Sequence, residues 1–504
     1  MTGKGGLFWG AVGNYVAFAL NMLAGFLLVP IVVHHLGKET YGGWTLVITL
    51  ANYYSLLDLG VTTAVTQAIA ARGKRADPDG ASRIINTSMA IFLRMGVFVF
   101  VVNATLGNWL LSLLSKEVSQ MQDVSLTVTL VGAALAVDFA AAVFRAVSTG
   151  CEDFRAVNVG TVVKCVTKVL LAVLLLGWQP RLACVGVAHL AAALLTLAWS
   201  YFAFRRVEPD VALRPRTIDW SVGRSLIVFG GIATVIRLAD IIRLPIGGFF
   251  IAKWGTIAEV GEYGIAVMLM AHGVGLVVTG TTVLTPRFSN LHADGNKAEM
   301  QRLLRESLGL SAVLAFGLAG GLILFSPGFI TLWIGKEFIA AAGILAIMPL
   351  GYAFALAQMP VTNFMLGVKK HHYHACAMSV EALANVVLCF VLVPKYGARG
   401  AAWALVIPMI TVKLLVQPLY VCKFAGLGLV SYFVPIVKTT LVTALILVAL
   451  RDWSWLDPGA TNVVKLVAGM CAYVAAVGGL GAIMVLSPEV RRKLLGKVRA
   501  LFGK

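Results

Sequence analysis

Ionisable side chains stand deep inside long apolar stretches of this sequence, where water does not solvate them. A charge at the centre of a membrane helix costs about 2.5–3.5 kcal/mol on insertion scales, so it normally faces a bundle interior or a watery cavity. The acidic members of the set are Asp58, Asp138, Asp240 and Glu381. The basic members outnumber them: Arg94, Arg145, Lys164, Lys168, Arg237, Arg243, Lys413 and Lys438. This surplus of positive charge favours an anionic ligand.

Some of these side chains could reach a membrane surface instead, because a long basic side chain near a helix end can extend its charge into water. The residues near an expected cytoplasmic end are Arg145, Lys164, Lys413, Lys438 and Glu381. The deepest residues are then Arg94, Lys168, Arg237, Arg243, Asp58, Asp138 and Asp240. We predict that the cations of a substrate cavity are Arg94, Lys164, Lys168, Arg237 and Arg243.

Lys164 and Lys168 are four residues apart, so they share one face of a helix. Their own apolar stretch, 157–177, contains no carboxylate. One interpretation is that Asp138 or water satisfies Lys168 while Lys164 extends to the surface. The other is an anion-attracting wall, because two like charges on one face in a low dielectric repel unless an anion meets them.

Arg237, Asp240 and Arg243 follow one another at intervals of three residues and cover an arc of roughly 120° on a helix. Asp240 can neutralise either arginine, which leaves one positive charge over. The group is either a self-neutralised structural cluster or a phosphate-binding arginine held by its carboxylate. Arginine suits the second role because its planar fork binds phosphate oxygens in pairs.

The intramembrane carboxylates Asp58, Asp138 and Asp240 are candidates for coupling protons or sodium ions, since such groups often relay ions. They could equally be counter-ions, with Asp58 and Asp138 serving Arg94 and Lys168. Both interpretations stay open.

Apolar helices must position these charges. Of the 504 residues, 59% are hydrophobic and 13% are charged, against roughly 25% charged in a soluble domain. A spanning helix needs about 20 apolar residues, so the sequence predicts an all-α polytopic membrane protein of about fourteen spans. They lie near 8–33, 41–70, 84–114, 124–149, 157–177, 182–204, 224–251, 262–286, 306–326, 339–367, 375–393, 398–422, 431–450 and 462–486.

Lysine and arginine are distributed unevenly between alternating loops. The even-numbered loops, counted from the N-terminus, and the C-terminal tail hold most of them, as at Arg205-Arg206 and Lys369-Lys370. The positive-inside rule therefore predicts that both termini are cytoplasmic. The net charge of +18 then mostly reflects topology. Because the basic residues are dispersed over many short loops, we expect no nucleic-acid partner.

The longest polar loop follows the sixth span and contains Pro209 and Pro215. It divides the sequence into two six-helix halves, a symmetry common in transporters. The predicted domains are an N-lobe at 1–206, a cytoplasmic linker at 207–223, a C-lobe at 224–424, and two further spans with a basic tail at 425–504.

No catalytic motif emerges from the sequence. It contains no phosphate-binding loop and no Gly-x-Ser-x-Gly, and its seven cysteines are scattered without a CxxC pair. His372 and His374 have a spacing that could bind a metal, but with Lys369 and Lys370 they fit better as a basic loop near lipid headgroups or an incoming phosphate. We expect no enzyme activity, no cofactor and no metal.

Motifs in sequential order resemble those of the Wzx-type polysaccharide flippases. The first match is Leu36-Gly37, Tyr41-Gly42 and Asp58-Leu59-Gly60. Others are Gly150, Phe154 and Asn158 after the fourth span, and Gly335 and Phe338 before the tenth. The last lies between the eleventh and twelfth spans, at Pro394, Tyr396, Gly397 and Gly400.

This resemblance implies the multidrug/oligosaccharidyl-lipid/polysaccharide exporter superfamily, whose members form two six-helix lobes around a central cavity. Its Wzx-type branch moves undecaprenyl-diphosphate-linked oligosaccharide to the periplasmic leaflet for O-antigen, capsule or exopolysaccharide, by alternating access. A polysaccharide polymerase and a chain-length regulator would be natural partners. Lipid II is a less fitting substrate, because the first span has no arginine.

Two other functions remain as alternatives. One is a drug or metabolite cation antiporter of the same superfamily, although an acidic cavity would suit cations better than this surplus of bases. The other is a membrane polysaccharide polymerase or ligase, although the short outer loops leave little room for a catalytic motif.

Overall fold

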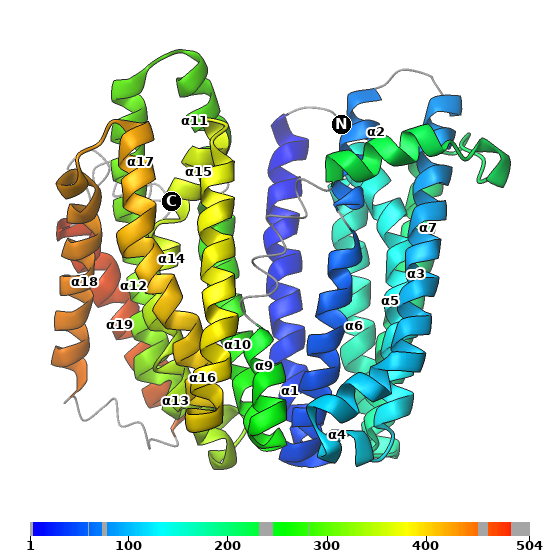
Figure 1. Ribbon diagram of the computed structural model, residues 1–504, viewed down its shortest axis with the longest axis horizontal. Helices are drawn as coiled ribbons and strands as arrows, with labels where there is room; N and C mark the ends of the chain where they lie inside the picture. Colours follow the sequence, from blue (N-terminus) through cyan, green and yellow to red (C-terminus); the bar gives the residue numbers. More distant parts are fainter. Residues whose placement is uncertain are drawn as a thin grey trace. The chain divides into compact units, whose positions relative to one another are not determined.

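The computed structural model describes residues 4–58, 60–72, 78–230, 245–281, 283–451 and 462–484. These residues contain helices, turns and loops and no strand. The chain forms two compact units (Figure 1). Unit 1 is Met1–Ile242 with Thr256–Gly261, and unit 2 is Arg243–Gly255 with Glu262–Lys504.

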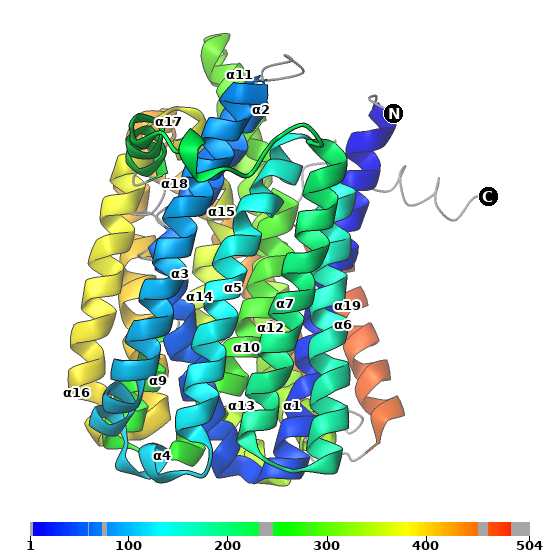
Figure 2. The same cartoon turned by 90° about the vertical axis from the view of Figure 1, so that its right-hand side faces the viewer.

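Unit 1 is a bundle in which α5 packs against both α3 and α7, and α6 packs against α1 and α7. Figure 2 shows α3, α5 and α7 side by side. The elements are α1 (Lys4–Tyr54), η1 (Ser55–Asp58), α2 (Val61–Arg72), α3 (Pro78–Leu114), α4 (Lys116–Gln120), α5 (Val124–Gly150), α6 (Phe154–Trp178), α7 (Leu182–Val207) and η2 (Pro215–Thr217).

Glycine turns join spans that the sequence predicts as separate helices. In α1, two helices meet at Gly37, whose φ of 80° and ψ of 171° are not helical. This joins the predicted spans 8–33 and 41–70. A positive φ is a conformation that glycine adopts without steric cost, because it has no Cβ.

The predicted span 41–70 is not continuous, because the helix breaks between η1 and α2. Gly60 has a φ of +68°, and a Cβ there would lie 2.3 Å from the carbonyl oxygen of Gly230. Only a residue without a side chain fits both conditions. Asp58 closes the break: its Oδ1 accepts hydrogen bonds from the Thr62 amide, at 3.0 Å, and the Thr62 hydroxyl, at 2.8 Å.

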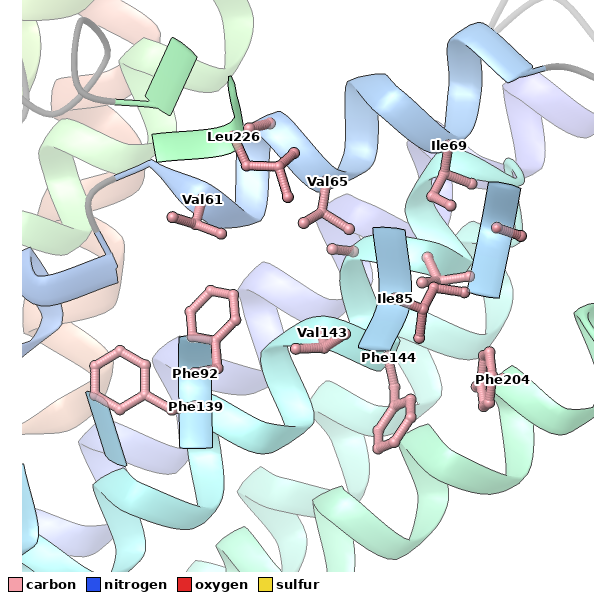
Figure 3. Packing of buried hydrophobic residues seen from close by; sticks show 14 of the residues in the cluster. Val61, Val65, Ile69, Ile85, Phe92, Phe139, Val143, Phe144, Phe204 and Leu226 are labelled. Carbon is pink, nitrogen blue, oxygen red and sulfur yellow. The ribbon is translucent and has the colours of Figure 1, made fainter. Parts of the chain in front are cut away.

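The apolar core of unit 1 lies where α2 meets α3, α5 and α7. Figure 3 shows this packing, in which side chains of α2 lie beside aromatic rings of the longer helices. Its labelled members are Val61, Val65, Ile69, Ile85, Phe92, Phe139, Val143, Phe144, Phe204 and Leu226. Burial of these apolar side chains therefore holds α2, the second part of the broken span, against the bundle.

Side chains of α3 hold the stretch predicted as a linker, 207–223. The Asn86 amide donates to the Ala212 carbonyl at 2.9 Å and accepts from the Arg214 amide at 3.1 Å, while Thr87 Oγ1 accepts from the Asp219 amide at 2.9 Å. Asp219 precedes helical residues 220–230. Hydrogen bonds from the Ser221 hydroxyl and amide lower the pKa of Asp219, as is usual for a carboxylate at a helix N-terminus.

Unit 2 is built around α12, which packs against α14, α18 and α19. The long helices α16 and α12 run through most of this unit (Figure 1). Its elements are α9 (Ile246–Trp254), most of α10 (Ile257–Thr281), α11 (Leu284–Ala293), α12 (Lys297–Trp333), η3 (Lys336–Phe338), α13 (Ile339–Leu345), α14 (Met348–Ala357), α15 (Met359–Gly367), α16 (His371–Thr411), the π-helical η4 (Val412–Val416), α17 (Gln417–Ala425), α18 (Leu429–Arg451) and α19 (Val463–Met484).

A second glycine turn lies inside α16, at Gly397, with φ of 55° and ψ of −137°. A Cβ on Gly400 would lie 2.3 Å from the carbonyl oxygen of Leu392. In a straight helix, eight residues would separate these two positions by about 12 Å. The chain therefore reverses here, and the predicted spans 375–393 and 398–422 form a hairpin.

The structure confirms an all-α polytopic membrane fold. The described residues contain 9 helical stretches long and apolar enough to cross a membrane, or up to 10 if the pair Lys336–Leu345 and Met348–Gly367, bent by 44°, is one span. Two of these stretches, Val16–Tyr54 and His372–Ala425, contain the turns at Gly37 and Gly397, so each includes residues of two predicted spans. The number fourteen and the cytoplasmic position of both termini stay predictions.

Candidate functional site

A charge pair joins α5 and α6 in unit 1. The Lys164 Nζ atom donates to Asp138 Oδ2 at 2.5 Å. The two side chains keep 38% and 23% of their surface exposed, so the pair is only partly shielded. One interpretation had Asp138 or water satisfy Lys168 while Lys164 extended to the surface, but Lys164 is the lysine that pairs with Asp138.

Lys168 lies one helical turn farther along α6 and is half-buried. It interacts electrostatically with Asp138 and Lys164, and also with His189 of α7. The Trp44 ring covers His189, with ring centroids 4.9 Å apart. Both lysines thus share the single carboxylate of Asp138, and four helices, α1, α5, α6 and α7, surround them.

Arg145 adds a third cation, one turn from the end of α5. Its Nη2 atom lies 3.5 Å from the backbone oxygen of Asp138, and its guanidinium interacts electrostatically with Asp138 and Asp58. We name Asp58, Asp138, Arg145, Lys164 and Lys168 the unit 1 charge cluster. When all are ionised, three cations face two carboxylates, which leaves one positive charge for a ligand.

Arg94 contacts an aromatic ring of the stretch that follows α7. Its side chain is exposed on α3, and its Cζ atom lies 4.4 Å from the centroid of the Trp220 ring. Such a cation–π contact is worth about 0.5–1 kcal/mol at an exposed site. The contact ties the helical residues 220–230 to α3, and the predicted cavity role of Arg94 is not tested by it.

Arg237, Asp240 and Arg243 lie outside the described residues. Their predicted roles, as phosphate-binding arginines and their counter-ion, stay predictions.

Unit 2 contains a buried charge pair that sequence reasoning dismissed. Lys413 and Glu381 lie near an expected cytoplasmic end, from which Lys413 could have extended to the membrane surface, but only 4% and 0% of these residues is exposed. Lys413 Nζ lies 4.0 Å from Glu381 Oε2 and donates to Gln417 Oε1 at 3.0 Å. Neither side chain extends to the surface, because both face the interior of the bundle.

The local reason is the π-helical turn η4, which contains Lys413. A π turn inserts one residue into a helix and rotates the residues that follow, and it is frequent at functional sites. Pro408 and Pro418 flank this turn, and each lacks the N–H that a regular helix would use. This pair of prolines around a lysine is the signal in the sequence that could have revealed the buried site.

A family model described as "Polysaccharide biosynthesis protein" matches residues 10–292, more than half of the chain. This range contains the whole unit 1 charge cluster.

Relatives and solved structures agree with that match. A Shigella flexneri protein named as an O-antigen transporter is 22% identical over 416 residues, 81% of this chain and 96% of the relative. The membrane protein EpsK of Bacillus subtilis is 21% identical over 419 residues, 82% of each chain. A structure of the lipid II flippase MurJ in an inward closed conformation superposes with a TM-score of 0.70 at 13% identity, over 93% of this chain and 98% of that one. At that identity the superposition establishes the fold alone.

These matches confirm the resemblance to Wzx-type flippases that the motifs predict. The chain belongs to the polysaccharide biosynthesis protein family, as a multi-pass protein of the inner membrane.

Proposed function

We propose that the protein moves undecaprenyl-diphosphate-linked oligosaccharide repeat units from the cytoplasmic to the periplasmic leaflet, for O-antigen, capsule or exopolysaccharide. The family supports a flippase of polysaccharide biosynthesis, and the name of the Shigella flexneri relative supports a lipid-linked carbohydrate as its cargo. A polymerase and a chain-length regulator would use the exported units.

The observation that carries this proposal is the arrangement of Lys164 and Lys168 around one carboxylate. A lysine ammonium binds phosphate as a compact point charge. Asp138 holds Lys164 in place at 2.5 Å, while the second lysine has no carboxylate of its own within α6. An incoming diphosphate would complete the neutralisation of the unit 1 charge cluster.

In this mechanism the diphosphate binds the cluster, the sugars occupy a polar cavity and the polyprenyl tail stays in the bilayer. Arg94, Arg237 and Arg243 remain candidates for further contacts with the diphosphate. Alternating access then exposes the cargo to the other side. Asp138 returns to both lysines when the diphosphate leaves, so the site does not keep its cargo.

The direct test uses alanine at Lys164 and at Lys168, in a strain whose own copy of the gene is deleted. We expect each change to lower surface polysaccharide at least several-fold, and the double change to abolish it, because the cluster loses its surplus of positive charge. Protein abundance in the membrane is measured in parallel. The matched control is Lys438→Ala, since Lys438 is an exposed lysine of α18.

Normal export by the double variant would rule out this site. Labelling of lipid-linked repeat units from the periplasmic side separates the alternatives. A flippase defect leaves the units inside, whereas a polymerase or ligase defect leaves single units exposed outside. A cation antiporter would instead change the resistance of the cell to cationic drugs and leave polysaccharide unaltered.

A further inference from the structure

The buried pair Glu381–Lys413 joins two facing stripes of polar side chains in unit 2, with one member in each stripe. On α16 the stripe contains His374, Glu381 and Asn385, at intervals of seven and four residues. The facing stripe contains Lys413 of η4 and Gln417 and Tyr420 of α17, at intervals of four and three residues. All except Tyr420, which is half-buried, belong to the buried class. The intervals on α16 keep one face of a helix. The hydrogen bonds from Lys413 to Gln417 and between His374 and Tyr420 join the side chains further, so the stripes form a continuous polar seam.

The seam reaches the surface at the start of α16. His374 is 5% exposed, whereas the neighbouring His372 and Tyr373 are exposed. The His374 ring bonds through Nε2 to Thr362 Oγ1 at 3.1 Å and through Nδ1 to the Tyr420 hydroxyl at 3.3 Å. Tyr420 in turn interacts electrostatically with Glu381. An imidazole and a phenol can each accept and donate a proton, so they connect the surface with the buried carboxylate.

Ionisable groups approach Glu381 from three elements. Lys413 approaches from η4 and Tyr420 from α17, and His374 lies two turns earlier on α16 itself. Among the other described elements packed against α16, α13 and α15 contain no ionisable side chain, α14 contributes Tyr352, and α9 contributes the exposed Lys253, which lies over the Trp254 ring. The charge of the seam therefore depends on Glu381 and Lys413.

A buried ion pair is costly to maintain, because each ion loses several kcal/mol of hydration. Replacement by apolar residues is often neutral or stabilising for a fold, so such a pair is weak evidence for a purely structural role. Here a π turn, itself a local departure from regular helix, places the lysine beside the carboxylate. Both features indicate a function that requires a charge able to change.

We propose that Glu381 and Lys413 form a proton-binding site, filled from the exposed start of α16 through His374 and Tyr420. In the empty state the carboxylate and the ammonium neutralise each other. Uptake of one proton converts the Glu381 carboxylate to a carboxylic acid while Lys413 stays an ammonium, so the seam gains one positive charge. Release reverses the step along the same path. The site lies in unit 2, apart from the unit 1 charge cluster in sequence, and it does not depend on which cargo the protein carries.

Infrared difference spectroscopy of the full-length protein in nanodiscs tests this site, with the proton as the probe. We expect a protonated-carboxyl band to appear as the pH falls. Glu381→Gln should remove that band, and Glu299→Gln, a change at an exposed glutamate of α12, should leave it. Lys413→Gln should move the midpoint to higher pH, because loss of the neighbouring ammonium makes the carboxylate harder to keep ionised.

The relay is tested by kinetics. After a rapid drop in pH, His374→Phe should slow the appearance of the Glu381 band at least several-fold and leave its final amplitude unaltered. Should Glu381→Gln be poorly folded, Glu381→Asp keeps a carboxyl group and should show a band at a shifted midpoint. A wild-type band of full amplitude in folded Glu381→Gln would overturn the site, and wild-type kinetics in His374→Phe would overturn the relay.

Discussion

At the scale of single residues, the partners of the carboxylates Asp58 and Asp138 were not evident from the sequence, which suggested Arg94 and Lys168 as their counter-ions. Asp138 binds Lys164 directly, and Asp58 caps α2 through Thr62. The sequence places both lysines on one face of α6, because that follows from spacing alone. It does not reveal which of them meets Asp138, because the partner comes from another helix whose rotation depends on packing.

Substitutions at Asp58 distinguish a structural role of this residue from a role in ion coupling. Asparagine caps a helix about as well as aspartate, whereas alanine at a cap costs about 0.5–2 kcal/mol. From the two hydrogen bonds to Thr62, we expect Asp58→Asn to keep both the thermal unfolding midpoint and polysaccharide export, and Asp58→Ala to lower the midpoint. Lost export by a stable Asp58→Asn protein would instead show that its charge, which interacts with Arg145, is essential.

The pair Glu381–Lys413 shows the limit of reasoning from distance to a helix end. That distance predicts that Lys413 can reach water, and the prediction fails because side-chain direction also matters. The π turn of η4 sets this direction, and no residue type specifies a π turn by itself. The flanking prolines are a hint that becomes clear only beside the buried glutamate.

At the scale of elements, the glycine-containing motifs are explained by geometry. Gly37, Gly60 and Gly397 all have positive φ, so they mark the places where helices turn or break. The motif residues Asp58 and Gly60 lie at a capped helix break rather than in a continuous span. Hydropathy does not reveal such a break, because the residues on both sides of it are apolar.

Gly60 is the most restricted of these positions. A side chain there would combine a left-handed backbone, which costs about 1–2 kcal/mol for an ordinary residue, with a contact of 2.3 Å to the Gly230 carbonyl oxygen. We expect Gly60→Ala to lower the thermal unfolding midpoint in detergent and the amount of protein in the membrane.

Gly177→Ala is the matched control for that change, because no atom lies within 4 Å of a Cβ at this position of α6. Alanine is also the better helix former there, by about 1 kcal/mol. If Gly60→Ala unfolded at the wild-type temperature, that result would contradict the close contact between residue 60 and the Gly230 carbonyl group.

At the scale of the whole molecule, composition was sufficient to predict an all-α membrane protein, because a chain with 13% charged residues cannot cover its surface with polar groups. The count of spans was harder to obtain. The turns at Gly37 and Gly397 are so short that α1 and α16 each include residues of two predicted spans, and the predicted span 41–70 is itself broken between η1 and α2. The orientation depends on the charge of loops, which the fold does not encode.

Cysteine accessibility tests that orientation. Gln179 lies in the exposed connection between α6 and α7, which is predicted to be periplasmic, and Arg216 lies in the exposed stretch predicted to be cytoplasmic. In a variant without native cysteines, we expect a membrane-impermeant maleimide added to spheroplasts to label Gln179→Cys and to leave Arg216→Cys unlabelled until the cells are lysed. The opposite pattern would invert the topology, and with it the side from which His374 takes up protons.

The attachment of residues 212–219 to α3 has a consequence for dividing the gene. The side chains of Asn86 and Thr87 hydrogen-bond to backbone groups of this stretch, so it belongs structurally with α3, although it follows α7 in the chain. If the chain were divided after residue 210, the second fragment would begin with the stretch 212–219, which binds α3 of the first fragment. The exposed Pro209-Asp210 is therefore the place at which two separately translated pieces could still find each other and reassemble.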